Sequence, residues 1–183
     1  MFSDPPFCVE DVWALPTPGG PDDPHRLVEW FTSAGGTERP SAAYRVLFAI
    51  RWKLGALLGW DEPGTGIGTR VRTLRDRLPD DLRDGTRGPD PTTVPFTSVY
   101  ETDTEWVAET ANRTVHAAMH IGWLPDDSGI GYHGQMAVLV KPDGLFGRVY
   151  MTMIVPFRYL LVYPALLCSI GRGWVRQPES PPA

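Results

Sequence analysis

Two glutamates and two histidines have the spacing of an acid–base pair repeated along a hairpin. His116 and His120 are four residues apart, and Glu105 and Glu109 have the same spacing in the segment before them. A tight turn at 112–113 would place Glu109 opposite His116, and Glu105 opposite His120. A carboxylate orients an imidazole for proton transfer, so such pairs can serve acid–base catalysis. They can also form a solvated cross-strand ladder, which is the interpretation that we favour.

The histidines do not have metal-ligand spacing. On a strand, His116 and His120 are separated by ~13 Å, which is too far to share one ion. His133 could approach His120 diagonally, but two histidines without a third ligand do not define a zinc site. No Gly-x-Ser-x-Gly nucleophile elbow occurs, and we expect Cys168, which lies in an apolar segment, to be a small core residue. We therefore expect no metal and no cofactor.

Two further groups of residues could serve a ligand. Four methionines fall on one predicted apolar face, where thioethers can line an adaptable pocket or simply fill gaps in a core: Met119, Met136, Met151 and Met153. Arg51 falls within the apolar arc of a predicted helix, so it must snorkel outwards, pair with an acid or hold an anionic ligand group. Glu101, Glu105 and Glu109 are the candidate acids, and Arg158 is a second cation that could join them.

These residues must be positioned by a sheet, because the apolar period becomes two from Phe96 onward. The predicted strands are 99–100, 106–110, 114–124, 132–141 and 148–155, after a first strand at 10–15. Helices are predicted at 24–33, with Asp22 or Asp23 as its N-cap, at 41–58 and after Pro156. A long surface excursion at 61–95 contains one short helix at 73–77.

Simple hairpin registers divide the sheet into an apolar and a polar face. Met119, Ile121, Met136 and Val138 belong to the apolar face, as does Trp106, and residues 149, 151, 153 and 155 are predicted to extend it. The histidines lie on the opposite face. The final helix must cover the apolar face, and Pro164 is expected to start or kink that helix.

Composition limits the classes of function. The 183 residues fit a single domain, with a core at about 9–176 and 42% hydrophobic residues. A formal charge of −5 argues against a nucleic-acid partner. The N-terminal residues carry no signal-peptide pattern, and two cysteines at opposite ends suit reduced thiols, so we expect a cytoplasmic protein. Pro156, Arg158 and Pro164 interrupt the apolar stretch 151–170, which favours a sheet-and-helix segment over a membrane span.

Several local motifs resemble an uncharacterised family, a domain of unknown function common in actinobacteria and grouped with START-like (SRPBCC) proteins. They are Ile50-Arg51-Trp52-Lys53-Leu54-Gly55, Asp103-Thr104-Glu105-Trp106, Ala111-Asn112-Arg113-Thr114-Val115-His116, Gly147-Arg148-Val149-Tyr150-Met151 and Ile154-Val155-Pro156-Phe157-Arg158. The resemblance spans 11–174. It implies an α+β helix-grip fold, in which an antiparallel sheet wraps around a long C-terminal helix.

Two functions fit this reading. The first is a protein that binds an apolar or amphipathic small molecule between sheet and helix, and its candidate ligand-binding residues are Arg51, Trp106, Met119, Met136, Met153 and Arg158. The second is an enzyme of the same fold, cyclase- or hydrolase-like, that uses His116, Glu109 or Arg51 in its cavity. The direction of the polar residues separates the two: a His–Glu pair facing the enclosed space favours the enzyme, and a face of methionines and aromatics favours the binder. Neither the ligand nor the oligomeric state follows from the sequence.

Overall fold

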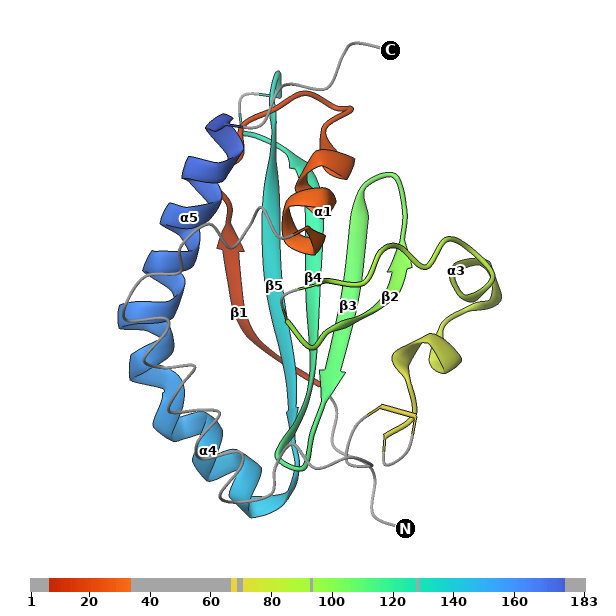
Figure 1. The fold of residues 1–183 in the computed structure, drawn as a ribbon, viewed down its shortest axis with the longest axis vertical. Coiled ribbons are helices and arrows are strands. Elements are labelled where there is room, and N and C mark those ends of the chain that lie inside the picture. Colours follow the sequence, from red (N-terminus) through yellow and green to blue (C-terminus); the bar gives the residue numbers. More distant parts are fainter. Residues whose placement is uncertain (1–6, 34–66, 69–70, 93, 128, 177–183) are drawn as a thin grey trace.

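A computed structural model of the chain describes residues 7–33, 67–68, 71–92, 94–127 and 129–176. Within these residues, a five-stranded antiparallel sheet has the strand order β1–β5–β4–β3–β2. The strands are β1 (Cys8–Ala14), β2 (Thr97–Glu101), β3 (Glu105–Ala111), β4 (Val115–Pro125) and β5 (Tyr132–Pro142). The helices are α1 (Pro24–Thr32), the 3₁₀-helix η2 (Leu74–Arg77), α3 (Asp80–Arg83), α4 (Gly144–Phe157), the π-helical η3 (Arg158–Val162) and α5 (Tyr163–Arg176). The chain is an α+β protein (Figure 1).

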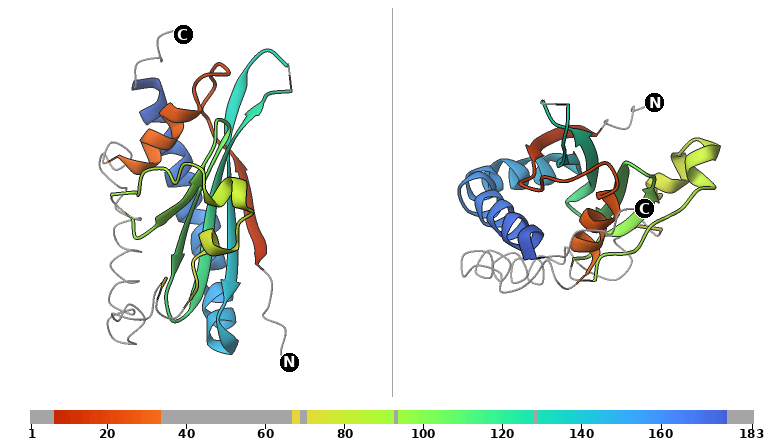
Figure 2. Two further views of the ribbon diagram at one scale, coloured as in Figure 1. Left: turned by 90° about the vertical axis from the view of Figure 1, so that its right-hand side faces the viewer. Right: turned by 90° about the horizontal axis from the view of Figure 1, so that it is seen from above.

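The helices divide between the two sides of the sheet (Figure 2). α4, η3 and α5 follow one another as one long curved helix, which we call the C-terminal helix, and it lies on the same side as α1. We call this side of the sheet the inner face. The segment 71–92, with η2 and α3, starts against the other side, the outer face, where Leu74 bonds to Glu109, and then passes the edge strand β2 to α1, where Thr92 bonds to Thr32. We call this segment the strap.

The structure confirms the strands predicted between residues 99 and 141. They form where predicted because the turns between them contain residues that stabilise hairpins. Asn112 accepts hydrogen bonds through its side-chain oxygen from the backbone N–H groups of Thr114, at 2.9 Å, and Val115, at 3.1 Å. Such an Asx turn fixes the connection from β3 to β4. α1 and the short helix at 74–77 are also confirmed, although Asp23 at the N-cap of α1 makes no side-chain capping bond.

The predicted division of the sheet into two faces is confirmed by its register. Met119 pairs with Val138, and Ile121 pairs with Met136, so all four side chains share the inner face. Trp106 pairs with Ile121 and joins them. His116 and His120 alternate with these residues and therefore lie on the outer face.

The predicted strand at 148–155 is wrong, because this segment belongs to α4. The turn at 142–144 begins a helix, with Gly144 at φ +62°. At Gly147 a Cβ atom would lie 2.2 Å from the carbonyl oxygen of Thr114, so only glycine lets the helix start this close to β4. The residues from Val149 to Val155 are apolar on all sides, and such a run satisfies the period of a strand as well as that of a helix.

Two prolines lie within the C-terminal helix without ending it. Pro156 lies in the last turn of α4, and the π-helical turn η3 follows directly. A proline donates no backbone hydrogen bond, and a π-helical turn accommodates the disturbed ladder. Pro164 is the second residue of α5, in agreement with the prediction that it starts or kinks the final helix.

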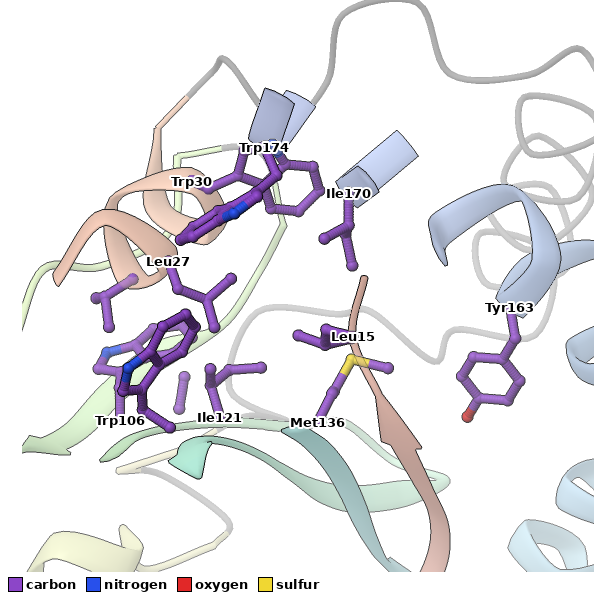
Figure 3. Packing of buried hydrophobic residues seen from close by; sticks show 12 residues of the cluster. Leu15, Leu27, Trp30, Trp106, Ile121, Met136, Tyr163, Ile170 and Trp174 are labelled. Carbon is purple, nitrogen blue, oxygen red and sulfur yellow. The ribbon is translucent and has the colours of Figure 1, made fainter. Parts of the chain in front are cut away.

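The core lies between the inner face, α1 and α5 (Figure 3). Its fully buried members include Trp106 and Ile170, both at 0% exposure, Leu27 at 1% and Met136 at 2%. Ile170 and Trp174 from α5 belong to the same cluster as Met136. The prediction that the final helix packs on the methionine-bearing face is therefore confirmed for α5. The predicted helix 41–58, with Arg51, lies outside the described residues.

Candidate functional site

A buried polar group joins the first strand to the C-terminal helix. Arg158 in η3 forms an ion pair with Asp11 in β1, and it also donates a hydrogen bond to the hydroxyl of Tyr163 at 2.9 Å. The hydroxyls of Tyr159 and Tyr163 both donate to the Asp11 carboxylate. Asp11 is 5% exposed, whereas Tyr159 is 44% exposed. We call Asp11, Arg158, Tyr159 and Tyr163 the Arg158 cluster.

Burial within the Arg158 cluster holds Tyr163 in the neutral form. Burial raises the pKa of Tyr163 above its usual value of 10.0, although the charge of Arg158 acts in the opposite direction. Glu10 adds a second, longer contact to Arg158 at 3.5 Å. A neutral tyrosine can donate one hydrogen bond and accept another. The Tyr163 hydroxyl does both, with Asp11 and Arg158, whereas the Tyr159 hydroxyl donates to Asp11 and can accept a hydrogen bond from a polar ligand group.

Trp13 borders this cluster and keeps an unused hydrogen-bond donor. Its ring centroid lies 5.0 Å from that of Tyr163 and 6.0 Å from that of Tyr159. The indole Nε1 is buried and has no hydrogen-bond partner among the residues that the structure describes. A buried N–H without a partner carries a desolvation cost of ~1–3 kcal/mol, which a hydrogen-bond acceptor of a ligand could relieve.

The register places apolar side chains directly beside the Arg158 cluster. Asp11 pairs with Val138, which pairs with Met119, so the three residues form one row across the inner face. Neighbouring strands are ~4.8 Å apart, which puts Met119 about 10 Å from Asp11. Val138 and Met119 are half-buried, whereas Met136 and Ile121 in the next row are only 2% exposed. The inner face is therefore closed towards α1 and α5 and more open along the row of Met119.

The structure brings together some of the residues predicted to bind a ligand and separates others. Trp106, Met119 and Met136 share the inner face, and Arg158 reaches the same face at the edge strand β1. Trp106 is sealed in the core, where its indole N–H donates to Ser98 at 3.1 Å. Met153 is 66% exposed on α4, because the segment predicted as a strand is helical and directs this residue away from the sheet.

Sequence reasoning missed Asp11, Trp13, Tyr159 and Tyr163. A signal for Asp11 was present, since it is an acid at an inward position of a strand, and Arg158 is the one charge in the apolar run from Val149 to Ile170. Two opposite charges, each isolated within an apolar element, are expected to find one another because an unpaired buried charge is costly. No comparable signal marks the two tyrosines, whose position depends on the π-helical turn between them.

The outer face carries the predicted glutamate–histidine pairs, with a different register. His116 pairs with Ala111 and Glu109 pairs with Ala118, so each Glu–His contact runs diagonally instead of directly across the strands. The contacts are nevertheless short: Glu109 Oε2 lies 2.7 Å from His116 Nε2, and Glu105 Oε2 lies 2.7 Å from His120 Nε2.

The first of these pairs is sealed, which corrects the expectation of a solvated ladder. Glu109 and His116 have side chains that are 0% and 5% exposed. Thr73 of the strap donates its hydroxyl to Glu109, and the backbone N–H of Leu74 donates to the same oxygen at 3.0 Å. The ring of Phe7 packs edge-on against His116 at 4.9 Å. These contacts leave the buried pair no open side among the described residues.

Two other features of the described residues do not form a site. No group of three or more histidine, cysteine, aspartate or glutamate side chains in this part of the chain could hold a metal ion. A hollow of about 10 Å³, with room for about one water molecule, opens beside α1 and the β2–β3 hairpin, lined by residues that include Leu27, Glu101 and Trp123. It is smaller than a typical ligand pocket and lies apart from the Arg158 cluster.

The sheet, the C-terminal helix and the Arg158 cluster define an α+β protein with a helix-grip-like arrangement. The chain belongs to the family described as protein of unknown function (DUF2867), whose model matches residues 5–165. The match includes all five strands, and Asp11, Met119 and Arg158 lie within it. No curated protein and no solved structure matches the chain significantly.

Proposed function

We propose that this protein binds an apolar or amphipathic small molecule in the manner of START-like (SRPBCC) helix-grip proteins, within the cytoplasm of a bacterium. The observation that carries the proposal is the row Asp11–Val138–Met119 on the inner face. One end of the row is polar and charged, and the rest is apolar and half-buried. An amphipathic molecule lying along it would place its polar group at the Arg158 cluster and its apolar part against Met119.

The Arg158 cluster favours a ligand group that accepts hydrogen bonds without carrying a strong charge. Asp11 already balances the charge of Arg158, so a full anion would face a buried carboxylate nearby. The hydroxyls of Tyr159 and Tyr163 already donate to Asp11, so the buried Nε1 of Trp13 is the donor that a ligand would meet in the same place. A carbonyl, hydroxyl or protonated acid group fits this arrangement.

The alternative function, an enzyme that uses Glu109 and His116 in the cavity, has less support. A catalytic pair must reach its substrate, and this pair lies on the outer face beneath the strap. The polar residues of the Arg158 cluster lie between β1 and the C-terminal helix, where they can bind and orient a ligand. The predicted third participant, Arg51, lies outside the described residues.

Native mass spectrometry of freshly purified protein should detect a bound small molecule, and an uncharged, environment-sensitive apolar dye should bind to protein stripped of it. Met119→Trp should reduce this uptake by about tenfold or more, because the larger ring fills the half-buried row. Met153→Trp is the matched control, since the same change at an exposed position should leave uptake unaltered.

Two results would contradict the proposal. One is a parent protein that neither retains a small molecule nor takes up the apolar dye. The other is equal uptake by the Met119→Trp and Met153→Trp variants when both show the circular dichroism spectrum of the parent, because Met119 would then be part of an ordinary core.

A further inference from the structure

The outward side of the C-terminal helix is apolar where solvent-facing helices are normally polar. Large apolar side chains recur every four residues along it and are exposed: Leu145 at 75%, Val149 at 47%, Met153 at 66%, Phe157 at 48% and Leu161 at 40%, with Leu160 at 74% beside them. We call these six residues the apolar strip. A helix that packs on one side and faces water on the other is expected to be polar on its outer side. The strip therefore indicates a partner that is itself apolar.

The charge of the C-terminal helix is the reverse of that of the whole chain. Between Gly144 and Arg176 the sequence has four arginines and no aspartate or glutamate, although the chain as a whole carries a formal charge of −5. Arg148 is exposed within the first turns of α4, and Arg172 is exposed beyond the strip, on α5. Exposed apolar side chains flanked by arginines suit a surface that is apolar inside and negatively charged at its boundary.

From these observations we infer that the apolar strip is a docking surface for an anionic lipid bilayer, with the helix lying along the membrane surface. The six apolar side chains would enter the boundary between headgroups and acyl chains, and the arginines would contact acidic headgroups. This inference goes beyond the proposed ligand site, which lies on the other side of the helix, and it does not depend on that site.

The helix lies on the membrane in this proposal and does not cross it. Gly147–Arg176 is long and apolar enough to span a bilayer, with only 17% of its most apolar window buried. However, Tyr163, Ile170 and Trp174 pack into the core, and Arg158 pairs with Asp11. Spanning would remove these contacts and leave Asp11 buried without its cation, whereas surface binding keeps them all.

A second copy of the chain fits the strip less well than a lipid surface. Two copies that met through their strips would bring together helices that both carry arginines and no acid, so the charges on the helices would repel one another. An acidic bilayer meets the same helix with opposite charge.

Vesicle flotation tests the inference directly. The protein should float with vesicles made of equal parts phosphatidylcholine and phosphatidylserine, bind pure phosphatidylcholine vesicles more weakly, and lose binding to the acidic vesicles as salt is raised. Leu160→Glu should reduce the partition coefficient about tenfold or more, since it replaces an inserted apolar side chain by a charge. Arg148→Gln should reduce it about fivefold on acidic vesicles only.

Ile130→Glu is the matched control. Ile130 is 88% exposed between β4 and β5, and α4 follows the opposite end of β5, so the same charge change there should leave binding unaltered. Circular dichroism of each variant verifies the fold. The inference is overturned if the parent does not float with acidic vesicles, or if Leu160→Glu and Ile130→Glu bind equally. It is also overturned if light scattering shows a dimer that Leu160→Glu dissociates while vesicle binding is absent.

Discussion

Two Glu–His pairs on the same two strands differ almost only in what covers them. Glu109–His116 and Glu105–His120 have the same 2.7 Å contact between carboxylate and imidazole. The first pair is sealed beneath the strap at 0% and 5% exposure, whereas the second has side chains that are 34% and 29% exposed. The same chemistry thus occurs once in a dry and once in a wet setting, which makes each pair a control for the other.

Because the two pairs have the same residue types, their difference in burial must determine how much each contributes to stability. The sealed pair satisfies donors from the strap as well as from the strand, so it holds the strap on the sheet. Among the residues that the structure describes, the open pair has only Tyr100 as a further side-chain partner, at 3.2 Å. We therefore expect a structural role for the first pair and a small energetic effect for the second.

The largest expected effect is that of Glu109→Ala. It leaves His116 and the strap donors buried without their partner, so the free energy of unfolding should fall by ~3–5 kcal/mol. Urea denaturation followed by tryptophan fluorescence measures the loss. Stability equal to that of the parent would show that the pair does not hold the strap on the sheet.

Thr73→Val should have the next largest effect. It removes the hydroxyl that donates to the buried Glu109 carboxylate while keeping the side-chain shape, at a cost of ~1.5–3 kcal/mol. The strap should also become more sensitive to protease at its exposed arginines, such as Arg77. Unchanged cleavage together with unchanged stability would show that the strap is held by other contacts.

Glu105→Ala breaks the open pair and should cost less than about 1 kcal/mol, because solvent replaces the lost contact. A double-mutant cycle with His120→Ala isolates the pairwise energy and can be set against the same cycle for Glu109 and His116. Similar coupling energies in the two cycles would refute the idea that burial distinguishes the pairs.

Tyr100 provides the smallest effect and a pH dependence. Burial, followed by the negative charge of Glu105 and the hydrogen bond to it, raises the pKa of Tyr100 from 10.0 to about 12. The folded state therefore holds this proton more tightly than the unfolded state, so the stabilisation is complete below pH 10 and is lost as the pH rises towards 12. Ultraviolet titration should show late tyrosine ionisation, to which Tyr163 also contributes. The part due to Tyr100 should disappear in Tyr100→Phe and titrate earlier in Glu105→Gln. A parent protein without a late tyrosine would contradict this.

The meander could be predicted from the sequence because local chemistry specifies it. The Asn112 side chain builds the turn from β3 to β4, and alternating apolar residues set the faces. The register was predicted two residues out of place, since a shift of two keeps every side chain on its face and leaves the apolar pattern unchanged. The sequence could not predict that His116 is buried and His120 is not, because this depends on which of the two pairs the strap covers.

The failure at 148–155 has a related cause. A surface helix is recognised in a sequence by one apolar and one polar side. α4 has large apolar residues on both sides, since Met151 is buried and Met153 is exposed. The alternation of Val149, Met151, Met153 and Val155 then fits a strand equally well. The apolar outer side of α4, which made the segment fit a strand, is also part of the apolar strip.

The pairing of β1 with β5 has a consequence for the order in which the protein can fold. During synthesis Cys8 leaves the ribosome long before Val140, its partner in the ladder, and the same is true of Asp11 and Arg158. The four strands from β2 to β5 are joined by short turns and can associate as soon as they are made, whereas β1 must wait for them. Until it docks, β5 is an open sheet edge that invites pairing with other chains. The nascent chain is therefore most prone to aggregation before β1 pairs with β5.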